Sequence, residues 1–198
     1  MWRLIAPRIA RRFWRDLVLS TAVGAALAGL FGVLHDQVTY TVSEEYFTKV
    51  KFVQFAYADP DMGPRAFAGV VGFLASWWVG AIAGWLLGRL AFPRLARREA
   101  WRRVAQGYGW VFGGALTGGL AGAVIGHRVV SSPALETWRW VQRELDVEQL
   151  DAFVRVACIH NGSYAGAFTG FVIAAVLIVR VRRGKADKQN ESPTEGAG

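Results

Sequence analysis

Four stretches of the chain contain no Asp, Glu, Lys or Arg and are long enough to cross a membrane as helices. A helix needs about 20 apolar residues to cross a hydrocarbon core of roughly 30 Å. Four such runs in a chain of 198 residues would be hard to bury in a soluble protein. The fold class that we predict is therefore an all-α membrane protein, a four-transmembrane-helix bundle that forms a single domain over residues 1–183. The expected spans are residues 17–35, 66–88, 104–126 and 156–179.

The basic residues divide unevenly between the segments that connect these spans. Sixteen of the 23 Lys and Arg residues precede the first span, lie between the second and third, or follow the fourth. The other two connections hold ten of the 15 acidic residues. Since cytoplasmic loops carry the Lys and Arg excess, we expect a multi-pass protein of the bacterial cytoplasmic (inner) membrane with both termini cytoplasmic. The lipid bilayer is then the expected partner, and the net charge of +8 does not indicate nucleic acid.

The two ends of the chain raise separate questions. Ala26-Leu27-Ala28 resembles a signal-peptidase site, but the apolar run continues to Leu34, so we expect the first span to stay uncleaved. The polar segment 184–198 lacks large apolar residues and is predicted to be a disordered cytoplasmic tail. The single cysteine, Cys158, excludes an internal disulfide framework.

Small residues recur every four positions in each span, so each predicted helix has one smooth face. Such faces let helix backbones approach closely inside a membrane, and we expect them to pack within one bundle. The pattern also resembles glycine-zipper helices, some of which line pores or form oligomers, so a homo-oligomer or a contact with another membrane protein stays open. The helix-packing positions that we predict are Gly80, Gly84, Gly118, Gly122, Gly166 and Gly170.

The two connections expected to face outward are too patterned for simple loops. In the first, residues 37–42 alternate like a short strand, and Ser43 can cap a short helix that follows. We therefore predict a strand and helix cap over 36–65. In the second, Ser132-Pro133 precedes a helical pattern, which predicts a helical cap over 127–155.

Two motifs resemble a known family. They are H-D-Q-x-T-Y-x-x-S-x-E-Y-F-T at 35–48 and H-N-x-S-Y at 160–164. Both are similar to motifs in a family of small uncharacterised bacterial four-span inner-membrane proteins, in which a proline often occupies the position of Glu44. The resemblance implies an inner-membrane protein and implies no activity.

The same motifs carry the candidate site. Polar side chains at membrane depth need hydrogen-bond partners, because an unpaired polar group there costs several kcal/mol. His160 and Tyr164 share one helix face, and both motifs end at the same membrane surface. We therefore expect one outward polar cluster, which consists of His35, Asp36, Glu45, His160, Asn161 and Tyr164.

All three histidines, His35, His127 and His160, lie at the expected outer ends of spans. Imidazoles beside carboxylates suit zinc, iron or copper. However, the chain has no H-E-x-x-H spacing, and the three positions are far apart in sequence. We therefore expect no metal and no other cofactor, and we expect these histidines to bond loop carbonyls.

No motif specifies a reaction, and we predict no catalytic residue. The first functional hypothesis is a non-enzymatic structural or interaction protein that acts through its outward caps. One alternative is a small transporter or channel component with glycine-lined helices, although uncharged spans argue against ion or proton coupling. A second alternative is a metal-dependent membrane enzyme with its site at the outer face.

Overall fold

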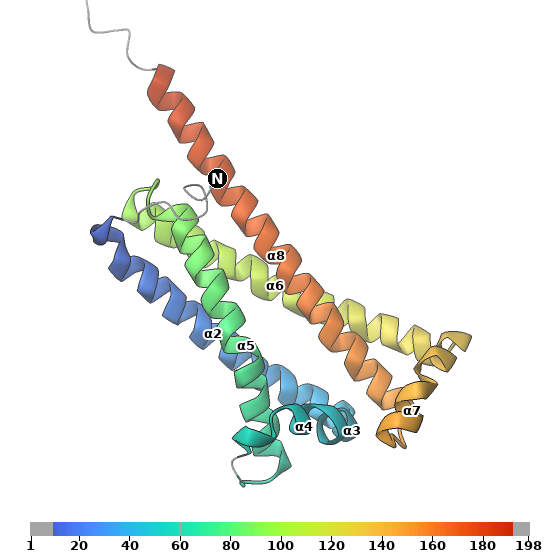
Figure 1. Ribbon diagram of the computed structural model, residues 1–198. Helices are drawn as coiled ribbons and strands as arrows, with labels where there is room; N and C mark the ends of the chain where they lie inside the picture. Colours follow the sequence, from blue (N-terminus) through green and yellow to red (C-terminus); the bar gives the residue numbers. More distant parts are fainter. Residues whose placement is uncertain (1–9, 60, 192–198) are drawn as a thin grey trace, which may run out of the picture.

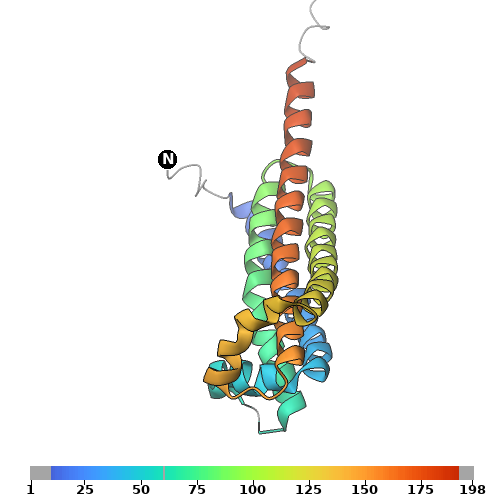
Figure 2. The ribbon, with the colours of Figure 1, turned by 90° about the vertical axis from the view of Figure 1, so that its right-hand side faces the viewer.

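The computed structural model describes residues 10–59 and 61–191, and within these ranges all regular secondary structure is helical (Figure 1). The four long helices are α2 (Trp14–Val42), α5 (Pro64–Ala91), α6 (Arg97–Val130) and α8 (Leu150–Glu191). They run lengthwise in one elongated bundle, with the start of α2 and the end of α8 toward the same end (Figures 1 and 2). The structure confirms an all-α bundle of four long helices.

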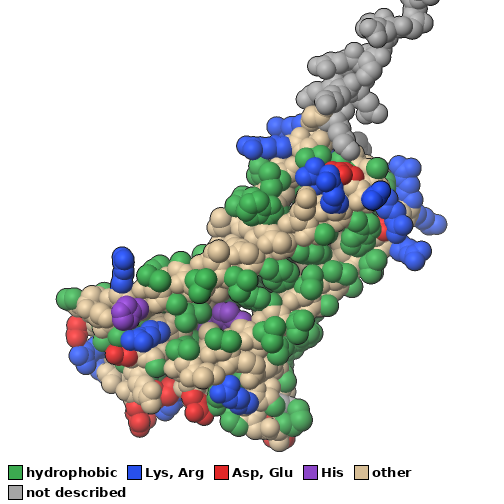
Figure 3. Space-filling view, turned by 180° about the vertical axis from the view of Figure 1, so that it is seen from behind, with side chains coloured by type: hydrophobic (Ala, Val, Ile, Leu, Met, Phe, Trp, Pro, Cys, Tyr) green, Lys and Arg blue, Asp and Glu red, His purple; other side chains and the backbone are tan. Residues whose placement is uncertain are grey.

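Each long helix is long and apolar enough to cross a membrane, and each contains one predicted span. Many large apolar side chains on these helices point outward and are exposed, among them Leu30, Trp78, Leu120 and Phe168. Figure 3 shows hydrophobic side chains along the length of the bundle, with Lys and Arg gathered at the end where α2 begins. This end is called the basic end here, and the opposite end, with residues 43–63 and 131–149, the cap end.

The bundle consists of two tightly packed hairpins, α2 with α5 and α6 with α8. Glycines lie where the backbones meet. A β-carbon on Gly80 would clash with the Gly24 carbonyl, and one on Gly118 would clash with the Gly162 carbonyl. Close backbone approach through small residues is how helices associate where lipid removes the hydrophobic driving force. The glycine faces are thus occupied inside each hairpin.

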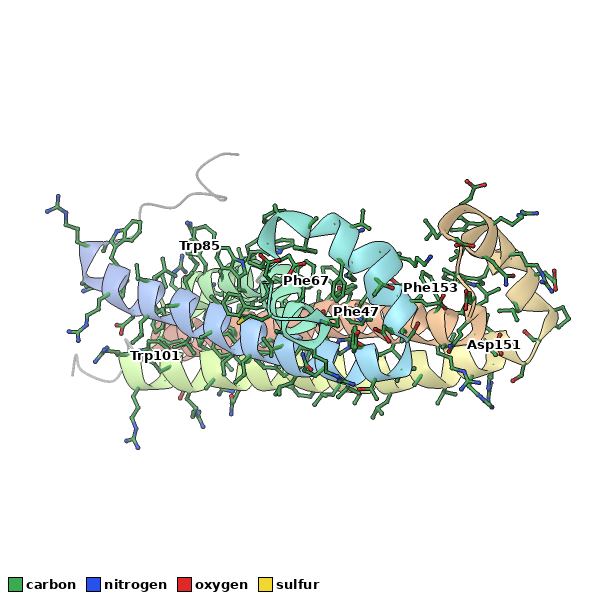
Figure 4. All side chains as sticks on the ribbon, turned by 90° about the horizontal axis from the view of Figure 1, so that it is seen from below. Phe47, Phe67, Trp85, Trp101, Asp151 and Phe153 are labelled. Atoms are coloured by element: carbon green, nitrogen blue, oxygen red, sulfur yellow. The ribbon has the colours of Figure 1, made fainter. Side chains whose placement is uncertain are left out.

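The two hairpins meet most firmly near the basic end. Asp16 on α2 accepts hydrogen bonds from Arg97 Nη2 at 2.8 Å and from the Trp101 indole at 3.0 Å, both on α6. Figure 4 labels Trp101 near the start of α6. Tyr108 on α6 donates to the Ser20 carbonyl. An apolar core that includes Leu87 completes the contact. These groups fix one end of the seam between the hairpins.

The predicted strand over residues 37–42 is wrong, because α2 continues as helix to Val42. The alternating pattern also satisfies a helix: Leu34, Val38 and Val42 are spaced four apart and are all exposed on one face. Residues four apart share a helix face, whereas residues two apart share a strand face, and this segment fits both periods. The expected strand is therefore the outer turn and a half of α2.

After α2, the chain forms the first cap from short helical pieces. Ser43 is extended, and its hydroxyl accepts a hydrogen bond from the Tyr46 amide at 3.3 Å, as its capping role predicts. The pieces are α3 (Glu44–Tyr46), a π-helical turn η2 (Phe47–Lys51), α4 (Phe52–Gln54) and a 3₁₀ turn η3 (Ala56–Ala58). Phe47 is fully buried below them (Figure 4).

The segment between α6 and α8 forms a 3₁₀ turn η4 (Pro133–Trp138) followed by α7 (Arg139–Leu145). The Ser132 hydroxyl accepts from the Ala134 amide and begins η4. Tyr46 of the first cap packs on Phe153 of α8, with ring centroids 5.2 Å apart (Figure 4). The first cap therefore contacts α8, and Lys49 of the first cap also pairs with Asp146 of the second at 3.7 Å.

α8 continues as helix through residues 184–191, where the sequence predicts a disordered tail. Figure 1 shows this end of α8 extending beyond the rest of the bundle. A segment that is polar on every face has no hydrophobic period that would predict a helix from its sequence. It can still extend a helix that packing has already started. The rest of the predicted tail, residues 192–198, lies outside the described residues.

Candidate functional site

Two of the three histidines face each other across the seam between the hairpins. His35 lies on α2 and His160 on α8, and their ring centroids are 4.6 Å apart with the rings nearly perpendicular. The third, His127, lies on α6 with an exposed side chain. The fold thus joins residues 125 positions apart into one imidazole pair and leaves His127 on the surface.

Asp36 lies beside both imidazoles. Its Oδ1 is 3.2 Å from His35 Nδ1 and 3.9 Å from His160 Nε2. Asp36 is 4% exposed and His160 is 2% exposed, so both are shielded from solvent. Among ion pairs between described residues, Asp36 pairs only with these two histidines. A buried carboxylate whose close partners are both imidazoles is an unusual arrangement, because burial of a charge is costly without compensation.

Two hydroxyl groups hold the imidazoles in place. Ser163 Oγ on α8 is 3.2 Å from His35 Nε2, and Thr39 Oγ1 on α2 is 3.2 Å from His160 Nε2. The Thr39 hydroxyl donates its own proton to the His35 carbonyl at 3.0 Å, so it accepts from His160. This assigns the His160 proton to Nε2. Both contacts cross between α2 and α8, and they connect the hairpins near the cap end.

Aromatic rings surround the cluster on its outward side. The rings of Tyr46 and Phe47 lie 5.0 and 6.2 Å from the His160 ring, measured between centroids. Lys51 of the first cap is buried too, and its ammonium lies 5.9 Å from the centre of the Tyr46 ring. Burial lowers the pKa of Lys51, and the nearby Asp36 charge opposes that shift. Burial also raises the pKa of the Tyr46 phenol. The first cap thus closes the cluster off from water.

On its inward side the cluster borders a chamber between the hairpins. The chamber has a volume of about 100 Å³ and is lined mainly by small and apolar side chains of all four long helices. His35, Asp36, His160 and Ser163 form its polar end. A groove of about 580 Å³ between α5 and α8 adjoins the chamber, and Ala167 lines both. The groove is bordered by outward-facing side chains such as Trp78 and Phe168.

The structure brings four of the six predicted cluster residues together and places two elsewhere. His35, Asp36 and His160 form the cluster, and Tyr164 lies one turn from His160 with ring centroids 6.2 Å apart. Asn161 has an exposed side chain. The Glu45 carboxylate instead accepts from the amides of residues 148 and 149, at 2.8 and 2.6 Å, just before α8 begins. Its role is to bond the start of α8, because a carboxylate is stabilised by the unpaired backbone amides at the N-terminus of a helix.

Sequence reasoning missed Thr39 and Ser163, the two hydroxyl groups that bond the imidazoles. A signal was available for both. Thr39 lies four residues after His35, and Ser163 lies three after His160, so each shares a helix face with the histidine on its own helix. Which hydroxyl bonds which imidazole depends on how α2 and α8 cross, and the sequence does not specify that crossing.

No protein-family model, curated protein or solved structure matches the chain. The argument for function therefore depends on the geometry of the cluster, the chamber and the groove.

Proposed function

We propose that the chain is a multi-pass protein of the bacterial cytoplasmic membrane with both termini cytoplasmic and both caps outward. Four helices of spanning length support this placement. So does the gathering of Lys and Arg at the basic end, because cytoplasmic segments carry the basic excess. The His35–Asp36–His160 cluster would then lie inside the bundle toward the outer surface.

We further propose that the protein binds a lipid-soluble ligand between its two hairpins, with the polar group of the ligand at the cluster. The observation that carries this proposal is a pair of adjoining cavities with shared lining residues. The groove between α5 and α8 is lined by exposed apolar side chains, and the apolar chamber beside it is lined by His35, Asp36 and His160. Buried polar groups that line a cavity among membrane helices are functional-site candidates.

The dimensions limit what the ligand can be. A chamber of about 100 Å³ is smaller than the cavity of roughly 150 Å³ that holds one benzene molecule in an engineered protein. The chamber therefore accepts a compact head group and excludes a whole lipid. The larger groove suits the hydrocarbon part of the molecule. The ligand class is thus an amphipathic molecule with a small hydrogen-bonding head and an apolar tail.

A matched pair of variants on α8 tests the ligand proposal. Ala167 lines the chamber, whereas Ala165 is exposed two residues away. Lipids that stay with the full chain after purification in mild detergent would be identified by mass spectrometry. We expect one lipid-soluble compound near one per chain in the unaltered protein and in Ala165→Phe. We expect at least tenfold less in Ala167→Phe. If the unaltered protein carries only bulk phospholipids in membrane proportions, the proposal fails.

A role through the outward caps is a second candidate, and one observation favours it. Val53, Tyr57 and Met62 of the first cap and Trp140 of the second are all more than half exposed. Exposed apolar side chains gathered at one end of a molecule are typical of a contact surface. Tyr57→Ser with Trp140→Ser would reduce the native complex mass in mild detergent if the caps hold a protein partner. An unchanged mass equal to one 21.7 kDa chain plus detergent would exclude this role.

A further inference from the structure

We infer that His35, Asp36 and His160 form a site for one transition-metal ion, with zinc as the expected metal. Each residue offers one donor atom, and the three atoms all lie within 4.8 Å of one another. Asp36 and His160 are buried, and His35 is 15% exposed at its side chain. This inference goes beyond the proposed ligand site and does not depend on it.

The two separations between Asp36 and the imidazoles are close to those of a tetrahedral ion. With metal–ligand bonds of about 2.0–2.2 Å, tetrahedral ligand atoms lie roughly 3.3–3.6 Å apart. The Asp36 Oδ1 distances of 3.2 Å to His35 Nδ1 and 3.9 Å to His160 Nε2 lie close to that range on either side. The donor nitrogens of His35 and His160 lie within 4.8 Å of each other, so the two imidazoles would approach by up to about 1 Å to share one centre.

The groups around the donors support the same assignment. A histidine that binds metal through one ring nitrogen usually donates its other N–H to a neighbour, which fixes the ring. If His35 binds through Nδ1, its Nε2–H donates to Ser163 Oγ at 3.2 Å. His160 Nε2 would exchange its contact with Thr39 for the metal bond, and the Thr39 hydroxyl keeps its own bond to the His35 carbonyl.

Charge gives an independent reason. Asp36 is buried in an apolar bundle, where no Lys or Arg of the described residues forms an ion pair with it and the charge of buried Lys51 reaches it only at longer range. A buried carboxylate is stable when it is paired or when it coordinates a metal. A divalent cation between Asp36 and two neutral imidazoles would supply that compensation.

The donor set indicates the class of metal. Two imidazole nitrogens and one carboxylate suit zinc, iron or copper, whereas magnesium and calcium prefer oxygen ligands. Three protein ligands leave a fourth position free, which is the pattern of zinc sites that bind water or another ligand. All three residues border the chamber, so an exchangeable ligand would reach the ion from there. The expectation of no metal, drawn from sequence spacing, is replaced by this inference.

The test uses zinc titration of the full chain in mild detergent, after a chelator has removed bound metal and with a chromophoric chelator as competitor. We expect one zinc per chain. His160→Ala and Asp36→Asn should each weaken binding at least tenfold, and the exposed His127→Ala should bind as the unaltered protein does. Equal affinity in His160→Ala and His127→Ala, or no zinc bound by the unaltered chain, would overturn the inference.

A second measurement needs no substitution and so does not depend on how well a variant folds. Cobalt in place of zinc gives strong visible absorption when it has four ligands and weak absorption when it has six. The unaltered chain loaded with one equivalent of Co²⁺ should show the strong spectrum. A weak spectrum like that of the aqueous ion would mean that no such site exists. Both readouts report metal alone, so they stand whether or not a lipid-soluble ligand is found.

Discussion

At the scale of single residues, the seam between α2 and α8 depends on hydrogen bonds between buried side chains. Ser163 bonds His35, and Thr39 bonds His160, so each helix contributes one hydroxyl and one imidazole. Such exchanges specify how two helices align, because a shift of one residue would leave several polar groups unpaired inside the bundle.

Ser163→Ala should destabilise the fold by about 1–2 kcal/mol, since it removes one hydrogen bond and leaves His35 Nε2 without that partner. Thr169→Ala is the matched control on the same helix. The exposed Thr169 hydroxyl bonds only the Ala165 carbonyl within its own helix, so its loss should change stability by less than about 0.5 kcal/mol. Reversible unfolding in mixed micelles measures both. Equal losses would show that the Ser163 contact contributes nothing.

The sequence indicates which polar residues lie toward the cap end of the long helices, but it does not indicate which of them meet. His35, Asp36 and His160 were predicted from the two motifs and the cost of unpaired polar groups in a membrane. Glu45 was placed with them because it lies near in sequence. The fold directs its carboxylate to the amides before α8, a pairing that depends on how the two caps dock.

At the scale of elements, the glycine faces bring the helices of each hairpin into backbone contact. The glycines differ in whether another helix lies against them, and α6 contains examples of both kinds. A β-carbon on Gly118 would clash with the Gly162 carbonyl, whereas a β-carbon on Gly113 would meet no atom within 4 Å.

Gly118→Leu should therefore separate α6 from α8 and lower the free energy of unfolding by about 3 kcal/mol or more, as a severe packing defect does. Gly113→Leu should leave that free energy nearly unchanged. Thermal unfolding in detergent, followed by circular dichroism, compares the two. If both variants melt alike, the glycine faces are not the contact surfaces.

The number and position of the long helices could be predicted because a charge-free run of spanning length has few other structures available to it. Their ends could not. Residues 37–42 fit both a strand and a helix, and residues 184–191 have no apolar period at all, yet both segments extend helices that begin elsewhere. The local sequence pattern predicts secondary structure least well at helix ends, where the adjoining helix determines whether the segment is helical.

At the scale of the whole molecule, the two ends of the bundle differ in charge and in structure. The basic end has the Asp16–Arg97 ion pair and the gathered Lys and Arg residues. The cap end has the short helices of both connections. This asymmetry is the basis for the proposed orientation in the membrane.

Orientation is tested by labelling of single cysteines in intact cells, with Cys158 replaced by Ala. Thr48 and Thr137 are exposed on the first and second caps, and Ser192 follows α8. Cysteines at Thr48 and Thr137 should react with a membrane-impermeant reagent, and one at Ser192 should react only after the cells are opened. Reaction at Ser192 alone in intact cells would reverse the orientation.

The most direct test of the central claim, that the hairpins meet at one imidazole pair, is a nuclear Overhauser measurement on the full chain with only its three histidines labelled. Ring centroids 4.6 Å apart predict a strong cross-peak between the ring protons of His35 and His160. A water-soluble relaxation agent should broaden only the exposed His127. Absence of that cross-peak, with all three rings broadened alike, would contradict the single site.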